Sequence, residues 1–185
     1  YNGTLLEIQA GMSGNMPLSE EVFNYLNQTF SDTAVVTARY WTVPGTQGLY
    51  VYLYNSSKTG SYRLDAIWGV MPQEENVTLR PIESILTAGR WLREDDYAHC
   101  LISTKVAEHL AVGINDTVSL RGFEMKIVGI FDEIQLGNKV ELDEEWILPI
   151  TDKRARADAA LTLIVPYRLA RDQPWRSYER GISMI

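Results

Sequence analysis

The stretch that most constrains the fold covers residues 101–131, LISTKVAEHLAVGINDTVSLRGFEMKIVGIF. Ser103 stands at a helix N-cap position, because its hydroxyl can accept a hydrogen bond from an amide of the first turn. Apolar residues then recur at helical spacing, namely Val106, Ala107, Leu110 and Ala111. We expect Gly113 to end this helix in the left-handed conformation. The stretch therefore predicts a strand end followed directly by a short helix.

A hairpin follows the predicted helix. Asn115 and Asp116 are typical turn residues that lead into a strand over 117–121, and Gly122 makes the next turn. Apolar and polar residues alternate in the returning strand, with Phe123, Met125 and Ile127 against Glu124 and Lys126. This period of two predicts one buried face and one solvent-exposed face. We expect Leu120 of the preceding strand to join the buried face.

Three short patterns in this part of the chain resemble those of a known family. They are AGRWLREDD at residues 88–96, G-x-N-D-T-V-x-L and K-I-V-G-I-F-D. Together they resemble the MacB-like extracytoplasmic core domain of FtsX-family ABC transporter permeases. In that family a G-R-x-F…D segment precedes a short helix and a G-D-x-V-x-L turn and strand. The match covers residues 88–132. Asn115 stands where the family usually has Gly, and it tolerates the same left-handed backbone.

The rest of the chain predicts an α+β fold. Residues 4–10 and 32–43 read as strands, and Ser19 opens a helix whose stripe of Val22, Phe23, Leu26 and Phe30 is expected to pack in the core. Strands are also expected near residues 49–54 and over 62–71. In the first of these, Tyr50, Tyr52 and Tyr54 face away from the apolar side. Such a ladder either binds a partner or covers a sheet with its hydroxyls in water.

The resemblance implies a mixed α/β sheet lobe with an inserted small β-rich lobe. Residues 1–81 plus 151–185 would form the first, porter-like lobe, and residues 82–150 would form the inserted one. The polar segment between Pro72 and Pro81 is typical of a connection between lobes, and Pro149 marks the return. We expect each lobe to have its own small core.

Composition narrows the class of function. With 185 residues, 45% of them hydrophobic, the chain can bury a core. A net charge of −7 argues against nucleic-acid binding, which needs a positive surface. The lone cysteine, Cys100, allows no internal disulfide and is expected to be a small buried side chain. No window of the sequence approaches the roughly 18 apolar residues that cross a bilayer.

Candidate chemical residues do not form a catalytic pattern. His99 and Cys100 are adjacent in a predicted strand, so they point to opposite faces. Ser13 lacks the glycine spacing of a nucleophile elbow, and His99 and His109 are the only histidines. The series Asp132, Gly137 and Glu141 is similar to a calcium loop, but apolar residues occupy ligand positions. We therefore predict no catalytic residues, no cofactor, no metal site and no enzyme activity.

Asparagine gives a hint about location. Five of the eight Asn residues stand in N-x-S/T sequons: Asn2, Asn27, Asn55, Asn76 and Asn115. Composition alone would give roughly one. The excess favours an exterior-facing chain in an organism that glycosylates, although Asn, Ser and Thr also cluster in turns for backbone reasons.

The resemblance implies a non-catalytic extracytoplasmic domain of a permease subunit, held in the cell membrane by flanking helices. Its partners would be a cytoplasmic ABC ATPase, a second permease copy and an extracytoplasmic adaptor. It would transmit ATPase-driven motion to an exported or extracted substrate or to an extracellular partner. The alternative is a free-standing extracellular module that binds a ligand or protein at the tyrosine face or in a cleft.

Overall fold

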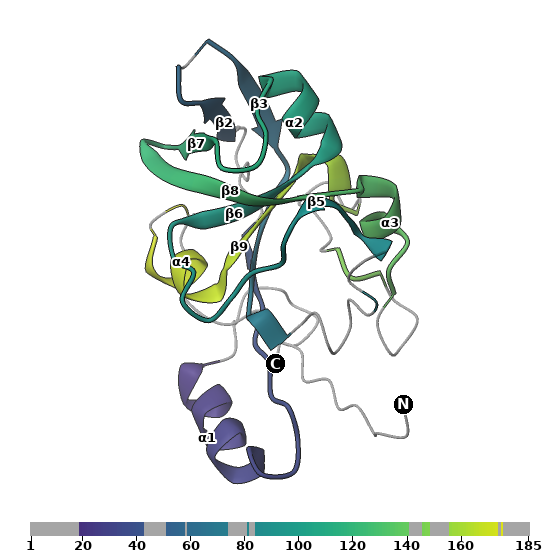
Figure 1. The fold of residues 1–185 in the computed structure, drawn as a ribbon. Coiled ribbons are helices and arrows are strands. Elements are labelled where there is room, and N and C mark those ends of the chain that lie inside the picture. The colour runs from purple at the N-terminus through teal and green to yellow at the C-terminus, as the bar shows by residue number, and fades with distance from the viewer. Residues whose placement is uncertain are drawn as a thin grey trace.

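The computed structural model describes residues 19–42, 51–57, 59–73, 81, 84–140, 146–148, 156–173 and 175 (Figure 1). The strand expected at residues 4–10, the segment around Ser13 and most of the Pro72–Pro81 connection lie outside these residues. Within them the chain is a mixed α/β structure, as expected.

Four α-helices and one short 3-10 turn are present in the described part of the chain. They are α1 (Glu20–Phe30), α2 (Thr104–Leu110), α3 (Glu133–Gly137), η4 (Ala159–Leu161) and α4 (Tyr167–Asp172). The strands are β1 (Tyr40–Thr42), β2 (Val51–Asn55), β3 (Ser61–Leu64), β4 (Ala66–Val70), β5 (Leu86–Gly89), β6 (His99–Ser103), β7 (Thr117–Leu120), β8 (Phe123–Phe131) and β9 (Thr162–Pro166).

These nine strands form one mixed sheet. Its order is β1-β4-β9-β6-β8-β7-β2-β3, and β5 pairs with β8 outside this path. The β4–β9 and β6–β8 pairs are parallel, whereas the other pairs are antiparallel. Only Asp65 separates β3 at one end of this order from β4 near the other end. The sheet must therefore curl strongly, because one continuous piece of chain serves both of its sides.

The buried side chains fall into two clusters, because successive residues of a strand point to opposite faces. In β9, Leu163 and Val165 belong to the larger cluster and Ile164 to the smaller one. In β6, Cys100 and Ile102 lie in the larger cluster. Every residue of β9 is buried, as is typical of strands covered on both faces.

The larger cluster draws on both predicted lobes. Val51, Leu53 and Leu64 come from residues 1–81, and they share the cluster with Met125 and Ile127 of the predicted insert. Among the described residues the two ranges therefore share one buried cluster, while the division into two lobes stays a prediction. The reason is the register: β2 pairs with β7, so a hairpin from one range completes the sheet of the other.

The hairpin over residues 117–131 matches its prediction. Met125, Ile127 and Leu120 are buried, while Glu124 and Lys126 are exposed. Phe123, also expected on the buried face, is only partly buried, and the first strand ends at Leu120 rather than at Arg121. The turn contains Arg121 and Gly122, both at positive φ. Ser103 caps α2 as expected, since its Oγ accepts from Val106 N at 3.2 Å.

Three details differ from expectation. The left-handed residue that ends α2 is Ala111 (φ 51°), while Gly113 stays outside the positive-φ region. The strand expected over 32–43 is, among described residues, only Tyr40–Thr42. The strand expected over 62–71 breaks at Asp65, whose backbone N–H donates to Leu161 O at 2.8 Å. Pairing between distant strands, rather than the β propensity of the local sequence, therefore sets where these strands begin and end.

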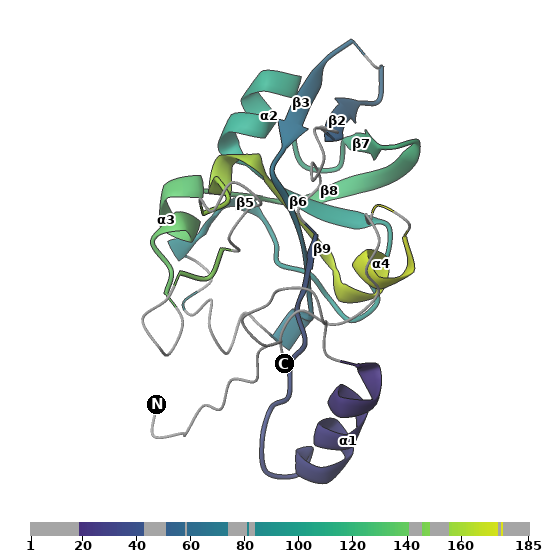
Figure 2. The ribbon, with the colours of Figure 1, turned by 180° about the vertical axis from the view of Figure 1, so that it is seen from behind.

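The prediction that α1 packs in the core is wrong. Ser19 caps the helix, but none of its residues is buried, and Val22 and Phe30 are 37% and 44% exposed. Figures 1 and 2 show α1 projecting from the sheet in both views. Near its start the Phe23 ring lies 6.3 Å from that of Tyr167, and Phe23 and Leu26 are half-buried.

Candidate functional site

The segment with the family-like pattern AGRWLREDD connects β5 to β6. Its second residue, Gly89, ends β5 with φ 76°, and an added Cβ there would come within 2.2 Å of Val128 O. The next residue, Arg90, donates its backbone N–H to the same oxygen at 2.9 Å. The glycine therefore lets the chain leave the sheet edge in close contact with β8.

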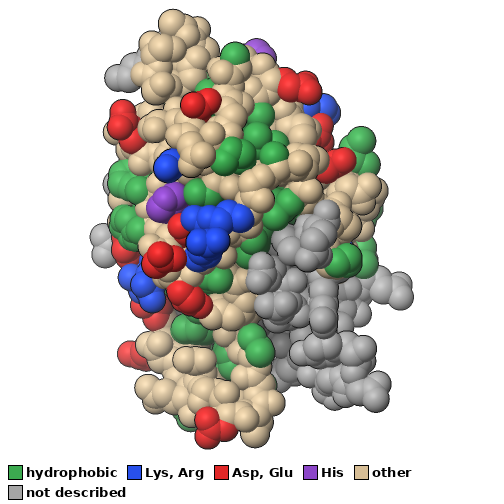
Figure 3. Space-filling model, in the orientation of Figure 1, with side chains coloured by type: hydrophobic (Ala, Val, Ile, Leu, Met, Phe, Trp, Pro, Cys, Tyr) green, Lys and Arg blue, Asp and Glu red, His purple; other side chains and the backbone are tan. Residues whose placement is uncertain are grey.

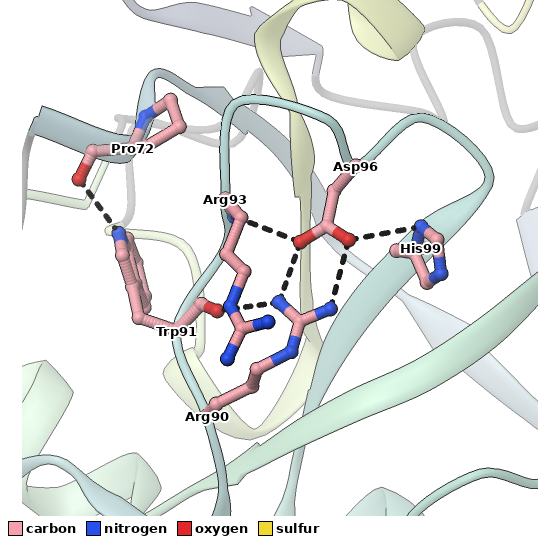
Figure 4. Close-up of polar contacts among 6 residues, drawn as sticks. All are labelled: Pro72, Arg90, Trp91, Arg93, Asp96 and His99. Atoms are coloured by element: carbon pink, nitrogen blue, oxygen red, sulfur yellow. Dashed lines mark hydrogen bonds and ion pairs between the residues drawn. The ribbon is translucent and has the colours of Figure 1, made fainter.

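The segment is held by one buried carboxylate (Figure 4). Arg90 Nη1 donates to Asp96 Oδ2 at 2.6 Å, and Nη2 donates to Oδ1 at 2.9 Å. The backbone N–H of Arg93 also donates to Oδ2, at 2.8 Å. His99 Nδ1 lies 3.2 Å from Oδ1 and forms an ion pair when the imidazole is protonated. A two-pronged guanidinium–carboxylate pair of this kind fixes geometry as well as charge.

Electrostatics favour the ionised pair. Burial alone raises the pKa of Asp96, but the hydrogen bonds from Arg90 and Arg93 and the nearby cationic charge outweigh burial and lower that pKa. The hydrogen bond to Asp96 raises the pKa of Arg90. Because both carboxylate oxygens are occupied, Asp96 does not serve as a general base, and we interpret the pair as a lock on the segment.

A second anchor ties the segment to β4. Trp91 is buried, and its Nε1 donates to Pro72 O at 3.1 Å, two residues past the end of that strand. The Trp91 carbonyl accepts from Arg90 Nη1 at 2.9 Å. The segment thus joins residues of both predicted lobes. Both Arg90 and Asp96 belong to the family-like pattern, but nothing in the local sequence predicts that their side chains form an ion pair.

The structure does not bring the other candidate residues together. The Cys100 side chain lies in the core, where burial raises its pKa, and His99 points to the partly exposed side. The Nε2 of His109 lies 3.1 Å from Ser61 O. Asp132 caps α3 by accepting from Ile134 N and Gln135 N. Ser13 and Glu141 lie outside the described residues.

Across the described ranges, no group of three His, Cys, Asp or Glu residues could hold a metal ion. Charge on the face in Figure 3 is mixed, since basic, acidic and histidine side chains gather beside one another. The expectation of no cofactor and no metal stays a prediction.

Two exposed features remain as candidate contact surfaces. In β2 two of the three predicted tyrosines face solvent: Tyr52 is 40% and Tyr54 38% exposed, while Val51 and Leu53 are buried. Tyr50 lies outside the described residues. The other feature is α1, where Tyr25 is 66% exposed. Sequence reasoning missed this exposure, because an apolar stripe is the usual signal of packing.

In the described residues the fold is that of a mixed α/β domain built on one nine-stranded sheet. A family model described as the MacB-like periplasmic core domain matches residues 2–172. The chain belongs to this family. No curated protein matches the sequence.

Two solved structures have similar folds. The periplasmic region of MacB from Actinobacillus actinomycetemcomitans is 14% identical, with a TM-score of 0.58, over 96% of this chain and 71% of that one. The extracellular domain of the noncanonic ABC-type transporter YknZ from Gram-positive bacteria is 12% identical, with a TM-score of 0.57, over 96% of this chain and 79% of that one. In the described part of this chain, no helix is long and apolar enough to cross a membrane.

Proposed function

We propose that the chain is the extracytoplasmic domain of an ABC transporter permease and that it transmits ATPase-driven motion as one rigid body. Family membership supports the setting. The observation that carries the mechanical role is the shared core, in which strands from residues 51–70, 99–131 and 162–166 pack in one cluster. A body of this kind moves as a unit, because separating its parts would expose buried apolar surface.

The Arg90–Asp96 lock contributes to this rigidity. It fixes the β5–β6 connection, and Trp91 attaches that connection to the backbone at Pro72. A loop between strands would otherwise be the first part to yield under load. The partners are a cytoplasmic ATPase, reached through the membrane part of the permease, a second permease copy and an extracytoplasmic adaptor. The domain would lie on the outer side of the cell membrane and need no chemistry of its own.

Spin-label distances in the full-length transporter test this proposal. One pair places a label at Lys126→Cys in each of two permease copies, and a second pair places labels at Lys105→Cys and Arg168→Cys within one copy. All three positions are exposed. Cys100→Ala removes the buried thiol. We expect the distance between copies to change with ATP, and the distance within one copy to stay constant.

A transporter with a hydrolysis-deficient ATPase is the control, and it should hold the ATP-bound distance. An unchanged distance between copies would contradict the mechanical role. It would favour the binding module instead, for which the exposed Tyr52 and Tyr54 are the supporting observation. A changed distance between Lys105 and Arg168 would instead show that the predicted lobes, 82–150 against 1–81 with 151–185, move relative to each other.

A further inference from the structure

The five sequons occupy different structural settings. Asn55 has a structural role: its Oδ1 accepts from Thr59 N at 3.0 Å and from Gly60 N at 3.2 Å, and its Nδ2 donates to Leu110 O at 3.4 Å. Asn115 has φ 74°, a conformation that asparagine tolerates better than most residues. Backbone needs therefore explain both. Asn2 and Asn76 lie outside the described residues.

Asn27 has no such explanation. It lies inside α1, where asparagine is a poor helix former, and its side chain is exposed. Its backbone carbonyl accepts from Ser31 N at 3.0 Å, but in the described part of the chain its side chain makes no hydrogen bond. Thr29, which completes the sequon, is exposed as well. Neither packing nor capping accounts for this Asn-x-Thr spacing.

From this we infer that Asn27 is an acceptor for an N-linked oligosaccharide. The inference rests on the proposed extracytoplasmic location. The donor is an oligosaccharide linked to a lipid phosphate, and an oligosaccharyl transferase catalyses the step. Asn27 Nδ2 forms a bond to the anomeric carbon, and the bond from that carbon to the phosphate oxygen breaks. The lipid phosphate leaves with the electron pair, while one amide proton passes to a base of the transferase.

The structure also accounts for how the enzyme reaches this sequon. A transferase must hold the asparagine amide and the hydroxyl of residue i+2 together, whereas in a helix these residues point roughly 200° apart. The helix must therefore unwind locally. None of the residues of α1 is buried, and an 11-residue helix is marginal without packing. Near its start, Glu20 Oε1 lies 3.8 Å from Arg171 Nε, and all residues from Asn27 to Phe30 are exposed. The second half, with Asn27 and Thr29, can open at little cost.

Local surface chemistry agrees with a glycan at this place. Tyr25 and Phe30 are 66% and 44% exposed on the same helix. Residues 19–35, which include α1, contain no Lys or Arg. A polar, bulky oligosaccharide beside the two rings would cover apolar surface that α1 leaves open to water.

Mass spectrometry of the full-length protein, purified from its natural host, tests the inference. We expect the peptide that contains Asn27 to carry a carbohydrate mass. Thr29→Ala should remove that mass although Asn27 itself remains, and Thr29→Ser should retain it. Asn24→Gln is the matched control, because Asn24 is exposed on the same helix outside any sequon and should have no effect.

An unmodified Asn27 peptide in the wild-type protein would overturn the inference. So would a modification that survives Thr29→Ala. A membrane-impermeant maleimide that reacts with Lys126→Cys in intact cells reports location separately. Labelled but unglycosylated protein would contradict the glycan alone, whereas unlabelled protein would contradict the extracytoplasmic location on which the inference depends.

Discussion

Asp96 is a residue whose contribution can be isolated. Its side chain is 3% exposed and that of Arg90 is 33% exposed. Replacing Asp96 with Asn leaves the guanidinium without its charged partner. We expect a loss of about 2–4 kcal/mol in unfolding free energy at pH 7, kept moderate by the partial exposure of Arg90. Urea denaturation gives the value.

The pH dependence has a definite sign. The folded-state pKa of Asp96 is lowered below the ordinary value of 3.8, so its ionisation stabilises the fold above that value. The difference in unfolding free energy between wild type and Asp96→Asn should shrink as the pH falls below about 4. It should vanish below the folded-state pKa. Asp95→Asn, at an exposed neighbour, should cost under about 0.5 kcal/mol throughout. Equal losses of unfolding free energy for Asp96→Asn and Asp95→Asn would show that the Arg90–Asp96 pair does not hold the segment.

Two glycines allow the cost of backbone strain to be measured apart from the cost of a steric clash. Gly89 and Gly122 both have positive φ, but a Cβ at Gly89 meets Val128 O at 2.2 Å, while one at Gly122 meets nothing within 4 Å. Gly122→Ala should cost about 1–2 kcal/mol from the left-handed backbone alone. Gly89→Ala should cost at least about 1 kcal/mol more. Thermal unfolding of the two variants measures the difference, and equal melting temperatures would contradict the close approach at Gly89.

At the scale of elements, the hairpin of β7 and β8 is the part that the sequence predicts best. Alternation over residues 123–127 has a period of two, and the burial of Met125 and Ile127 between exposed neighbours follows from it directly. Helix α1 shows the opposite case. Its apolar stripe has the same signal as a core helix, so no local pattern could reveal that it stands clear of the sheet.

The register of β8 gives a direct test. Ile127 is fully buried and Lys126 is exposed. Ile127→Ala should lower the unfolding free energy by about 2–5 kcal/mol, because it removes buried methyl groups and leaves a cavity. Lys126→Ala should change it by less than about 0.5 kcal/mol. Comparable losses in chemical denaturation would mean that β8 presents a different face to the core.

For the whole molecule, the class of fold and the family were accessible from the sequence, but the arrangement of its parts was not. Pairing of β2 with β7 and of β4 with β9 joins segments far apart in the chain. Periodicity shows which face of a strand is buried but not which strand is its neighbour. The Arg90–Asp96 pair was missed for a related reason, since it depends on a loop conformation rather than on a spacing rule.

A shared core predicts cooperative unfolding of the isolated domain. Tryptophan fluorescence and far-ultraviolet circular dichroism should give coincident transitions in urea, because Leu64 and Ile102, from the two predicted lobes, lie in one cluster. Leu64→Ala and Ile102→Ala should each shift both signals together. Two resolved transitions, each sensitive to only one of these variants, would restore the picture of separate cores.

The place of β9 has a consequence for how the protein is made. This strand lies between β4 and β6, although it is the last strand along the described chain. Until residue 166 has been synthesised, both neighbours present unpaired edges. At ribosomal rates of roughly 5–20 residues per second, β4 waits on the order of 5–20 s for its partner. During biogenesis the nascent domain therefore has open strand edges until β9 arrives, and we expect mutations that slow its arrival to lower yield before they lower stability.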